Sequence, residues 1–578
     1  MAERCRVGLG QRPAIDCAQP GRSAGLARIR QRLAAAVRPR RRPLGRVRMQ
    51  PKTRSGIPLK PFYAASDLPG GRTEETPGNY PFTRGRLQAT RSAGGWIQRE
   101  LSGEGSPKQS NAQLRYLIEQ GQTGIDVIGD APTMSMTDPD HPLARPAAGT
   151  QGVSACRKLD YLEMFEGIDL GSVSVSSSIP AVFSIAGLVH AARQAGVAPD
   201  RLRGSTIQVP LYCEDCSYRY HLPVGFRTRL AADAVAYCAT RMPRFHAFLE
   251  DSYFFSESGL NSVEEMALAF VEIRHILRRL LAMGVPVDQF GSRIAILLNC
   301  SMDLYEEIAK IRATRRLFAR MMHDEFGAND PRSQSVVITC HTSGLSLTAQ
   351  QPANNIVRGA VQAMALVMAG VQAIEISAFD EAYRTPSREA HLVGLRTQQI
   401  IDLESGIGQV ADPFGGSYFM ESLTAEMERR IWAMVTEIEA AGPIDRLVEQ
   451  GYFRAILHAA MERHGQDVSR GRAHLVGVNV HAIPEDDDRL LRAVSEMKFE
   501  PCEEHVERIV AFRASRDAAR HQACLRRALD CARSESGNLL EVTIDAFEAG
   551  ATMGEIAGVF RVGCGQAYDP FGRLPPPL

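Results

Sequence analysis

Apolar and polar positions repeat with two different periods along the chain from about residue 94 onward. Eight short stretches are rich in β-branched and apolar residues, as buried strands are, and longer segments with the 3.6-residue repeat of amphipathic helices separate them. The predicted strands are GWIQREL (about 94–101), GIDVIGD (124–130), GSVSVSSS (171–178), STIQVPL (205–211), HAFLEDSY (246–253), SRIAILLN (292–299), SVVITCH (335–341) and VQAIEIS (371–377).

This alternation predicts an α/β fold. Eight strands, each followed by a helix, fit a (β/α)8 TIM barrel, in which all strand carboxyl ends lie on one face and carry the chemistry. An open doubly wound sheet is the rival. No G-x-G-x-x-G follows the first strand, which disfavours a dinucleotide-binding sheet.

Two segments show the helical repeat most clearly, residues 262–284 and 354–370. The second opens on Asn354 and Asn355, which predict an N-cap, and it closes on Gly370, which predicts a C-cap.

After about residue 420 the pattern is mainly helical. Helices are predicted at 425–442, at about 504–533 and at about 538–560. The glycine pair in DPFGGSYFME (412–421) is interpreted as a tight backbone turn that packs these helices, and not as an anion-binding loop.

Four regions follow from these patterns. They are an Arg-rich extension (1–48), an extended subunit-contact arm (49–90), a TIM-barrel domain (91–425) and a helical C-terminal region (426–578). The arm is assigned because it has few apolar positions and many Pro, Gly and Ser residues.

The Arg-rich extension contains thirteen arginines and two acidic residues, Glu3 and Asp16. It has no apolar repeat, so it cannot bury a core, and we interpret it as disordered or as not part of the native protein, with Met49 as an alternative start. A targeting segment and a nucleic-acid or membrane-binding arm are the alternatives. The rest of the chain is mildly acidic, which argues against nucleic acid as its main partner.

The composition predicts a globular, cytoplasmic protein without a membrane span. The chain has 578 residues, of which 44% are apolar and 23% charged, and no run of about 18 apolar residues occurs. The twelve cysteines are scattered, as in a reducing compartment. One C-x-x-C occurs, Cys213 to Cys216, but no second pair completes a tetrahedral zinc site, and no metal site is predicted.

Polar side chains stand at several predicted strand ends, where a barrel keeps its active site. Thr339 and His341 share one face of their strand, and His341 is either an acid/base group or a structural histidine. Arg99 and Arg293 are candidates for holding a phosphate, or are ordinary ion-pair residues. No Ser-His-Asp set, zinc H-E-x-x-H or Walker loop is found, so these residues alone indicate only a barrel enzyme with a polar, aromatic mouth.

Several blocks of sequence are more specific. They are SGIPLKPFYAASDL (55–68), YPFTRG (80–85), LYEEIAKIRATRRLFARMM (304–322), TSGLSLTAQQPANNIVRGAVQAMA (342–365), FDEAYRTPS (379–387), TQQIIDLESGI (397–407) and VADPFGGSYFMESLT (410–424). Together they resemble the large, substrate-binding part of the adenosylcobalamin-dependent acyl-CoA mutases, the methylmalonyl-CoA and isobutyryl-CoA mutase family. The resemblance covers nearly everything after residue 49.

The resemblance implies a barrel that is split along its axis by the pantetheine chain of coenzyme A. It also implies radical carbon-skeleton isomerisation of an acyl-CoA, an isomerase reaction whose difficult chemistry is supplied by adenosylcobalamin. The family's cobalamin domain carries a D-x-H-x-x-G motif, which this sequence lacks. The cofactor is therefore expected on a separate small subunit, with a homodimer of large subunits inside a heterotetramer.

The family's functional residues carry over in part. The residues that the resemblance assigns to catalysis are Tyr253, Gln208, His341 and Tyr218. Those assigned to substrate and coenzyme A are Arg99, Ser174, Ser176, Thr206, Arg293, Leu101 and Phe254. Those assigned to the cofactor are Glu257, Glu381 and His341.

Several family positions hold different residues here. Leu101 stands in place of a tyrosine that wedges between cofactor and substrate, and Gly94 in place of an arginine. Phe254 replaces the histidine of the family's Tyr-His pair. Thr339 takes another histidine position and His341 its neighbouring glutamine position, so His341 is a candidate replacement for the lost hydrogen-bond donor.

Tyr218 stands where the dicarboxylate mutases place an arginine on the substrate carboxylate. A buried carboxylate without that partner costs several kcal/mol, so methylmalonyl-CoA is not expected as the substrate unless Arg219 or Arg91 replaces the missing arginine. The sequence therefore predicts a mutase for a different acyl-CoA. The alternative is a catalytically inert, mutase-like subunit with a structural or partner-binding role.

Overall fold

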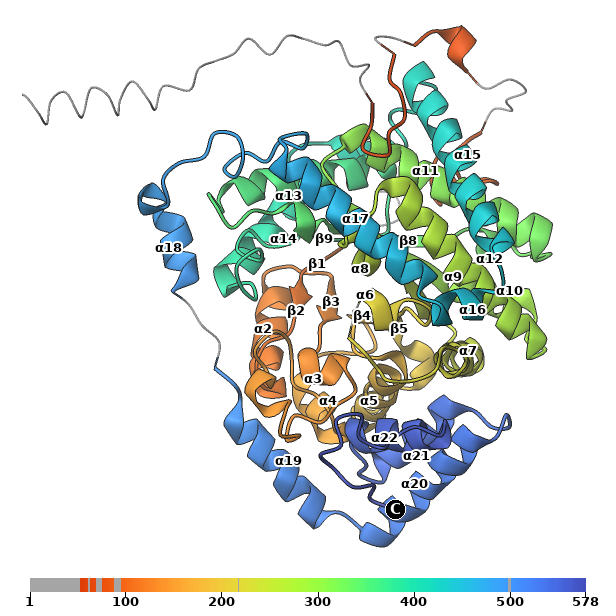
Figure 1. The fold of residues 1–578 in the computed structure, drawn as a ribbon, viewed down its shortest axis with the longest axis vertical. Helices are drawn as coiled ribbons and strands as arrows, with labels where there is room; N and C mark the ends of the chain where they lie inside the picture. Colours follow the sequence, from red (N-terminus) through yellow and green to blue (C-terminus); the bar gives the residue numbers. More distant parts are fainter. Residues whose placement is uncertain (1–51, 61–62, 69–74, 88–94, 217, 497–499) are drawn as a thin grey trace, which may run out of the picture. The chain divides into compact units, whose positions relative to one another are not determined.

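The computed structural model describes residues 52–60, 63–68, 75–87, 95–216, 218–496 and 500–578, and it confirms the predicted α/β barrel (Figure 1). Its strands are β1 (Ile97–Arg99), β2 (Leu101–Ser102), β3 (Gly124–Val127), β4 (Ser174–Ser177), β5 (Arg203–Gln208), β6 (Phe245–Asp251), β7 (Ile294–Cys300), β8 (Val337–Thr342) and β9 (Ala373–Glu375). Each of the eight predicted strands contains observed strand residues. The first is divided in two at Glu100.

The division of the first strand closes the barrel. All neighbouring strands are parallel, in the order β1-β9-β8-β7-β6-β5-β4-β3-β2. On one side Arg99 of β1 is in register with Glu375 of β9, and on the other Leu101 of β2 is in register with Asp126 of β3. The first strand thus changes partner at Glu100 and joins the two edges, so the structure excludes the open sheet.

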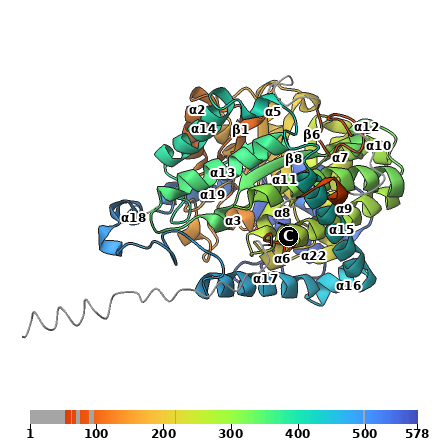
Figure 2. The same ribbon diagram turned by 90° about the horizontal axis from the view of Figure 1, so that it is seen from above.

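Helices connect successive strands. Those between β2 and β6 are α2 (Pro107–Glu119), α3 (Ala131–Met134), α4 (Lys158–Met164), α5 (Ala181–Gln194), α6 (Cys213–Cys216) and α7 (Val224–Arg241). Those between β6 and β9 are α8 (Ser252–Ser256), α9 (Ser262–Ala282), α10 (Val287–Phe290), α11 (Leu304–Arg320), α12 (Pro331–Gln334) and α13 (Asn354–Ala369). Seen from above, α13 lies beside β8 and α11 (Figure 2).

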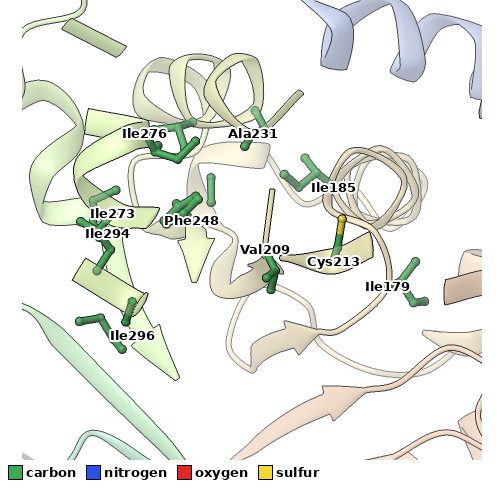
Figure 3. Packing of buried hydrophobic residues seen from close by; sticks show 14 of the residues in the cluster. Ile179, Ile185, Val209, Cys213, Ala231, Phe248, Ile273, Ile276, Ile294 and Ile296 are labelled. Atoms are coloured by element: carbon green, nitrogen blue, oxygen red, sulfur yellow. The ribbon is translucent and has the colours of Figure 1, made fainter. Parts of the chain in front are cut away.

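The main apolar core lies between the strands and these helices. Phe248, Ile294 and Ile296 on the strands belong to one buried cluster with Ile273 and Ile276 of α9. Figure 3 shows the two α9 residues close to Phe248 and Ile294. Burial of such side chains contributes roughly 1.5–3 kcal/mol each, so this layer holds the helices on the barrel.

The helix predictions at 262–284 and 354–370 are confirmed in position, and one predicted cap is corrected. Gly370 ends α13 in the left-handed conformation, with φ +71°. The predicted asparagine N-cap is wrong, because α13 begins at Asn354 itself and its N-cap is Ala353. The side-chain amide of Asn355 instead donates to the carbonyl oxygens of Thr348 and Phe379 and fixes the loops after β8 and β9.

The described residues after β9 are mainly helical. They form α14 (Arg388–Leu403), α15 (Tyr418–Ala440), α16 (Ile444–Glu449), α17 (Tyr452–Ser469), α18 (Arg489–Ser495), α19 (Glu503–Ser515), α20 (Ala518–Arg533), α21 (Leu539–Glu548) and α22 (Met553–Gly563). Helix α15 packs on α9 and α11, whereas α21 packs on α5 and α7 (Figure 1). Helix α15 also runs through the predicted boundary at 425/426.

Each of the two last predicted helices is two helices. The segment 504–533 breaks where Asp517 caps the start of α20 through its side chain. The segment 538–560 breaks at Gly550, with φ +89°, and Thr552 then caps α22. In both cases side-chain capping at the new start competes with continuation of the helix.

The described part of the predicted arm lies on the barrel of its own chain. Ser55 donates from its backbone N–H and its hydroxyl to Glu306 of α11, and Glu75 forms an ion pair with Arg316 of the same helix. Contact of this arm with another subunit stays a prediction. The Arg-rich extension 1–48 lies outside the described residues.

The glycine pair is confirmed as a turn that supports the C-terminal helices. A Cβ on Gly415 would lie 2.4 Å from Nη2 of Arg84 and from Oδ2 of Asp412, and Gly416 has a φ of +89°. The turn brings Asp412 against Arg84 and Arg312, with the first pair at 2.8 Å.

Arg312 of α11 is the centre of this contact. It is 1% exposed, and its guanidinium pairs with Asp412 and with Glu421, the second at 2.8 Å. Removal of one partner from a buried ion pair leaves an uncompensated charge. The turn therefore ties α15 to the barrel through α11.

Among the described residues, no helix combines the length and the apolar character that crossing a bilayer requires.

We predict that Asp412→Asn lowers the free energy of unfolding by about 3–5 kcal/mol, because it leaves two guanidinium groups without a shared carboxylate. Asn tolerates the positive φ of 48° at this position, so backbone strain does not contribute. Chemical denaturation measures the change. The matched control Asp200→Asn alters an exposed aspartate and leaves the midpoint unchanged; equal midpoints for both variants would contradict the assigned role.

Candidate functional site

Along each strand, the side chains that alternate with those of the main core point into the barrel. Leu249, Ala295 and Leu297 form a small buried cluster of their own, separate from the core that contains Ile294 and Ile296. Because side chains alternate along a strand, this second cluster faces the barrel interior. The interior near β6 and β7 is thus apolar.

The interior near β1, β3, β8 and β9 is charged. Asp126, His341 and Glu375 alternate with core residues of their strands, and with Arg99 they form what we call the Arg99 cluster. Arg99 contacts Asp126 at 3.5 Å and also pairs with Glu375, which in turn contacts His341. Nη2 of Arg99 donates to Thr339 at 2.9 Å.

The charges of this cluster are perturbed by burial. Burial lowers the pKa of His341 to about 4, so its imidazole is neutral at pH 7. Burial and the neighbouring Glu375 raise the pKa of Asp126 to about 8. His341 is therefore not a free acid/base group at neutral pH, and it is held against a carboxylate.

Two aromatic contacts lie at the carboxyl end of the barrel. The ring of Tyr253 in α8 lies 4.7 Å from that of His341, centroid to centroid. Tyr218 meets Phe254 edge to face, with ring centroids 6.5 Å apart. The structure thus brings together four of the predicted site residues, in two pairs.

The two predicted cofactor carboxylates are engaged within the chain. Glu257 accepts hydrogen bonds from Asn299 at 2.6 Å, from Ser343 at 2.9 Å and from the backbone N–H of Leu345. Glu381 accepts one from the N–H of Ala378 at 2.8 Å, and burial raises its pKa to about 7. Glu257 therefore fixes the loop after β8, and one oxygen of Glu381 fixes the loop after β9.

The other predicted site residues lie on the opposite wall. The hydroxyl of Ser176 contacts that of Ser205 at 3.1 Å, and Thr206 donates to the carbonyl of Ser177. Gln208 donates to the carbonyl of Ala247 and lines a cavity between β5, α5 and α7. Ser174 opens β4. Leu101 is not on this wall: it is half-buried on β2, beside the Arg99 cluster and in register with Asp126.

Arg293 does not meet Arg99. Arg293 precedes β7, whereas Arg99 is level with Glu375, His341 and Asn299 by strand register. Six residues along a strand correspond to about 20 Å, so the two arginines stand at different heights of the barrel.

Arg293 instead has three cationic or basic neighbours at the amino end of the strands, Arg86, Arg332 and His246. Arg86, which donates to the carbonyl of Ser335, and Arg332 both act on it electrostatically and, with burial, lower its pKa. Nδ1 of His246 has no hydrogen-bond partner there, and burial lowers the pKa of His246 to about 3. Among the described residues, no carboxylate forms an ion pair with Arg86 or Arg293. We call Arg86, Arg293 and His246 the amino-end cluster.

Sequence reasoning proposed Arg293 as a site residue but did not propose Arg86 or His246. His246 opens a predicted strand, so its position at the amino end was open to inference. Arg86 lies in an arm without periodicity, and only the tertiary fold brings it to Ser335.

The C-x-x-C segment is packed into the fold. It forms α6, and the thiol of buried Cys213 accepts a hydrogen bond from Arg227 at 2.9 Å. Burial raises the pKa of Cys213 to about 11, which keeps the thiol protonated. All described cysteines are free of disulfides.

Comparison with known proteins gives consistent matches. Residues 52–566 match a family model described as methylmalonyl-CoA mutase. The chain is 33% identical over 505 residues to the 2-hydroxyisobutanoyl-CoA mutase large subunit of Aquincola tertiaricarbonis, a match that covers 86% of this chain and 89% of that protein.

Two further relatives are longer than this chain. The methylmalonyl-CoA mutase of Rhizobium meliloti is 34% identical over 527 residues, which covers 90% of this chain and 73% of the relative. That of Cereibacter sphaeroides is 35% identical over 514 residues, which covers 87% and 71%.

Asp251 at the end of β6 provides a test of the electrostatics at the carboxyl end. It is 1% exposed, caps α8 through the N–H of Phe254, and burial raises its pKa to about 7. A carboxyl with a raised folded-state pKa keeps its proton when the unfolded chain has lost it, so stability falls as pH rises from about 4 to 7.

We predict that the free energy of unfolding of wild type falls by about 1.4 kcal/mol per pH unit relative to that of Asp251→Asn between about pH 4 and 7. The reason is that Asn keeps the helix cap but does not titrate. Denaturation curves at several pH values measure the difference. The control Asp200→Asn is expected to run parallel to wild type. Parallel curves for Asp251→Asn as well would show that the folded-state pKa is not raised.

Proposed function

Because this chain belongs to the methylmalonyl-CoA mutase family, we propose that it is the large, substrate-binding subunit of a coenzyme-B12-dependent acyl-CoA mutase. The reaction is carbon-skeleton isomerisation of an acyl-CoA other than methylmalonyl-CoA. The observation that carries the proposal is the amino-end cluster, in which Arg86 and Arg293 have no described carboxylate partner in a chain of this family.

The amino-end cluster suits the phosphates of coenzyme A. Half-buried guanidinium groups with no acid partner are stabilised by a bound anion, and Arg pairs with phosphate in bidentate geometry. The strand register separates this cluster from His341 by about 20 Å, a length over which an extended pantetheine chain runs along the barrel. The thioester of such a ligand would lie near the carboxyl ends.

The acyl end of the site supports a substrate without a free carboxylate. Tyr218, at the position that the dicarboxylate mutases fill with arginine, packs against Phe254, and Arg219 is exposed. A substrate carboxylate buried here would lack its bidentate partner, at a cost of several kcal/mol. Arg91, the other candidate replacement, lies outside the described residues.

The cofactor is proposed to be held mainly by a separate small subunit. The relative from Aquincola tertiaricarbonis is itself named a large subunit, and this chain covers 89% of it. The described residues after β9 are mainly helical, and Glu381, one of the predicted cofactor residues, accepts the N–H of Ala378 with one of its two carboxylate oxygens. When bound, adenosylcobalamin supplies the radical chemistry of the isomerisation.

The residues of this chain would bind and enclose the substrate. Arg86 and Arg293 hold the phosphates, Tyr253 and Phe254 exclude water from the acyl group, and Glu257 keeps the loop after β8 in place. We further propose a cytoplasmic heterotetramer built on a dimer of large subunits.

A catalytically inert subunit is the second candidate. It is favoured by the engagement of His341 with Glu375 and of Glu257 with three internal donors, which leaves few polar groups for a substrate. Such a subunit would bind an acyl-CoA or a partner without turnover.

Turnover separates the two candidates. The chain is mixed with a cobalamin-binding small subunit, which is sought first in the neighbouring reading frames, with adenosylcobalamin and with a panel of acyl-CoA esters. Isomerised esters are measured by chromatography. The proposal expects one branched or hydroxylated monoacyl ester to be converted and methylmalonyl-CoA not to be. Binding of esters without conversion of any would identify the inert subunit.

We predict that Arg86→Met and Arg293→Met each weaken binding of an acyl-CoA ester about 10–100-fold, the loss of one charge-assisted contact of roughly 1.5–3 kcal/mol. Isothermal titration of the large subunit alone measures the dissociation constant. Arg241→Met, at an exposed position at the end of α7, is the matched control. Unchanged affinity in both test variants would mean that the phosphates bind elsewhere.

A further inference from the structure

Three side chains of the Arg99 cluster form a compact set of metal-ligand types inside the barrel. One ligand atom from each of Asp126, His341 and Glu375 lies within 4.8 Å of the others. These residues come from β3, β8 and β9, and they are 2%, 5% and 2% exposed. The sequence predicts no metal site, because the three residues stand far apart in the chain and only barrel closure unites them.

The ligand atoms of this set lack hydrogen bonds. Among the described residues, Oδ1 of Asp126, Nε2 of His341 and both carboxylate oxygens of Glu375 have no hydrogen-bond partner. They are in close contact with one another and with Arg99, but the directions do not suit hydrogen bonds. Buried polar atoms of this kind are rare in folded proteins and need a partner.

The chemistry of the unpartnered atoms points to a cation as the missing partner. They are three carboxyl oxygens and one imidazole nitrogen, and each of them can donate a lone pair. A metal cation accepts lone pairs from such atoms, whereas an anion does not.

We propose that Asp126, His341 and Glu375 bind a divalent first-row cation of the Zn²⁺ type. One imidazole nitrogen and two carboxylate oxygens are a donor set that such borderline cations accept. Bonds of about 2.0–2.2 Å bring tetrahedral ligand atoms to about 3.4 Å from each other, so small side-chain rotations are sufficient. Three protein ligands leave a fourth position for water.

Arg99 acts as a competitor in this arrangement. Its guanidinium now contacts the two carboxylates that would bind the cation, and it repels a second positive charge. If these residues bind a metal ion, removal of Arg99 should therefore tighten cation binding.

The test uses the untagged large subunit alone, without cobalamin or acyl-CoA, so its outcome is independent of the proposed activity. Zn²⁺ is titrated by calorimetry, and the spectrum of bound Co²⁺ reports the ligand type. The expected result for wild type is one equivalent of tightly bound Zn²⁺ and a Co²⁺ spectrum without thiolate charge-transfer bands.

Variants identify the ligands. His341→Gln and Glu375→Gln are expected to weaken Zn²⁺ binding at least 100-fold, and Arg99→Met to tighten it at least tenfold. His474→Gln, at an exposed histidine, is the matched control, and Cys213→Ser with Cys216→Ser removes the C-x-x-C thiols. Both of these are expected to bind as wild type does.

Three results would overturn the proposal. The first is the absence of stoichiometric Zn²⁺ binding in both wild type and Arg99→Met, which would leave the cluster as an ion-pair network. The second is binding that persists in both ligand variants, and the third is binding lost with the thiols. The Arg99→Met variant and the Co²⁺ spectrum of wild type do not depend on the ligand variants. The proposal can therefore still be rejected if one ligand variant misfolds.

Discussion

The barrel depends on the change of strand partner at Glu100. Before this residue the first strand pairs with β9, and after it the strand pairs with β3. The first strand therefore joins the two edges of the sheet. Arg99 stands at this seam and contacts Asp126 on one side and Glu375 on the other. The Arg99 guanidinium thus links the strands on the two sides of the seam, and it also contributes a positive charge to the barrel interior.

The two ends of the barrel differ in charge as a result of where each residue stands on its strand. Arg86, Arg293 and His246 gather at the amino ends, whereas Asp126, Asp251 and Glu375 occupy the interior towards the carboxyl ends. An elongated ligand with phosphates at one end matches this polarity. Under the proposed function, the aromatic pairs at the carboxyl end would surround an acyl group that carries no charge.

Much of the fold could be predicted from the sequence because strands and helices have different apolar periods, and each predicted strand contains observed strand residues. The errors in the predicted helix ends occur where a single side-chain contact determines where a helix begins. Asn355 bonds to two loops instead of capping α13, and Asp517 starts a new helix inside a continuous helical pattern. Such competition between side-chain and backbone hydrogen bonds has no periodic signature.

The site was less predictable than the fold. Family resemblance proposed Arg293, Tyr253 and His341 as site residues, but it could not indicate that Glu375 contacts His341 or that Arg86 approaches Arg293, because these contacts join distant segments. The most direct test of the whole account is a crystal structure of the large subunit with a bound acyl-CoA ester. The account predicts phosphate density at Arg86 and Arg293 and the thioester near Tyr253, whereas a nucleotide bound outside the barrel or at its carboxyl end would contradict it.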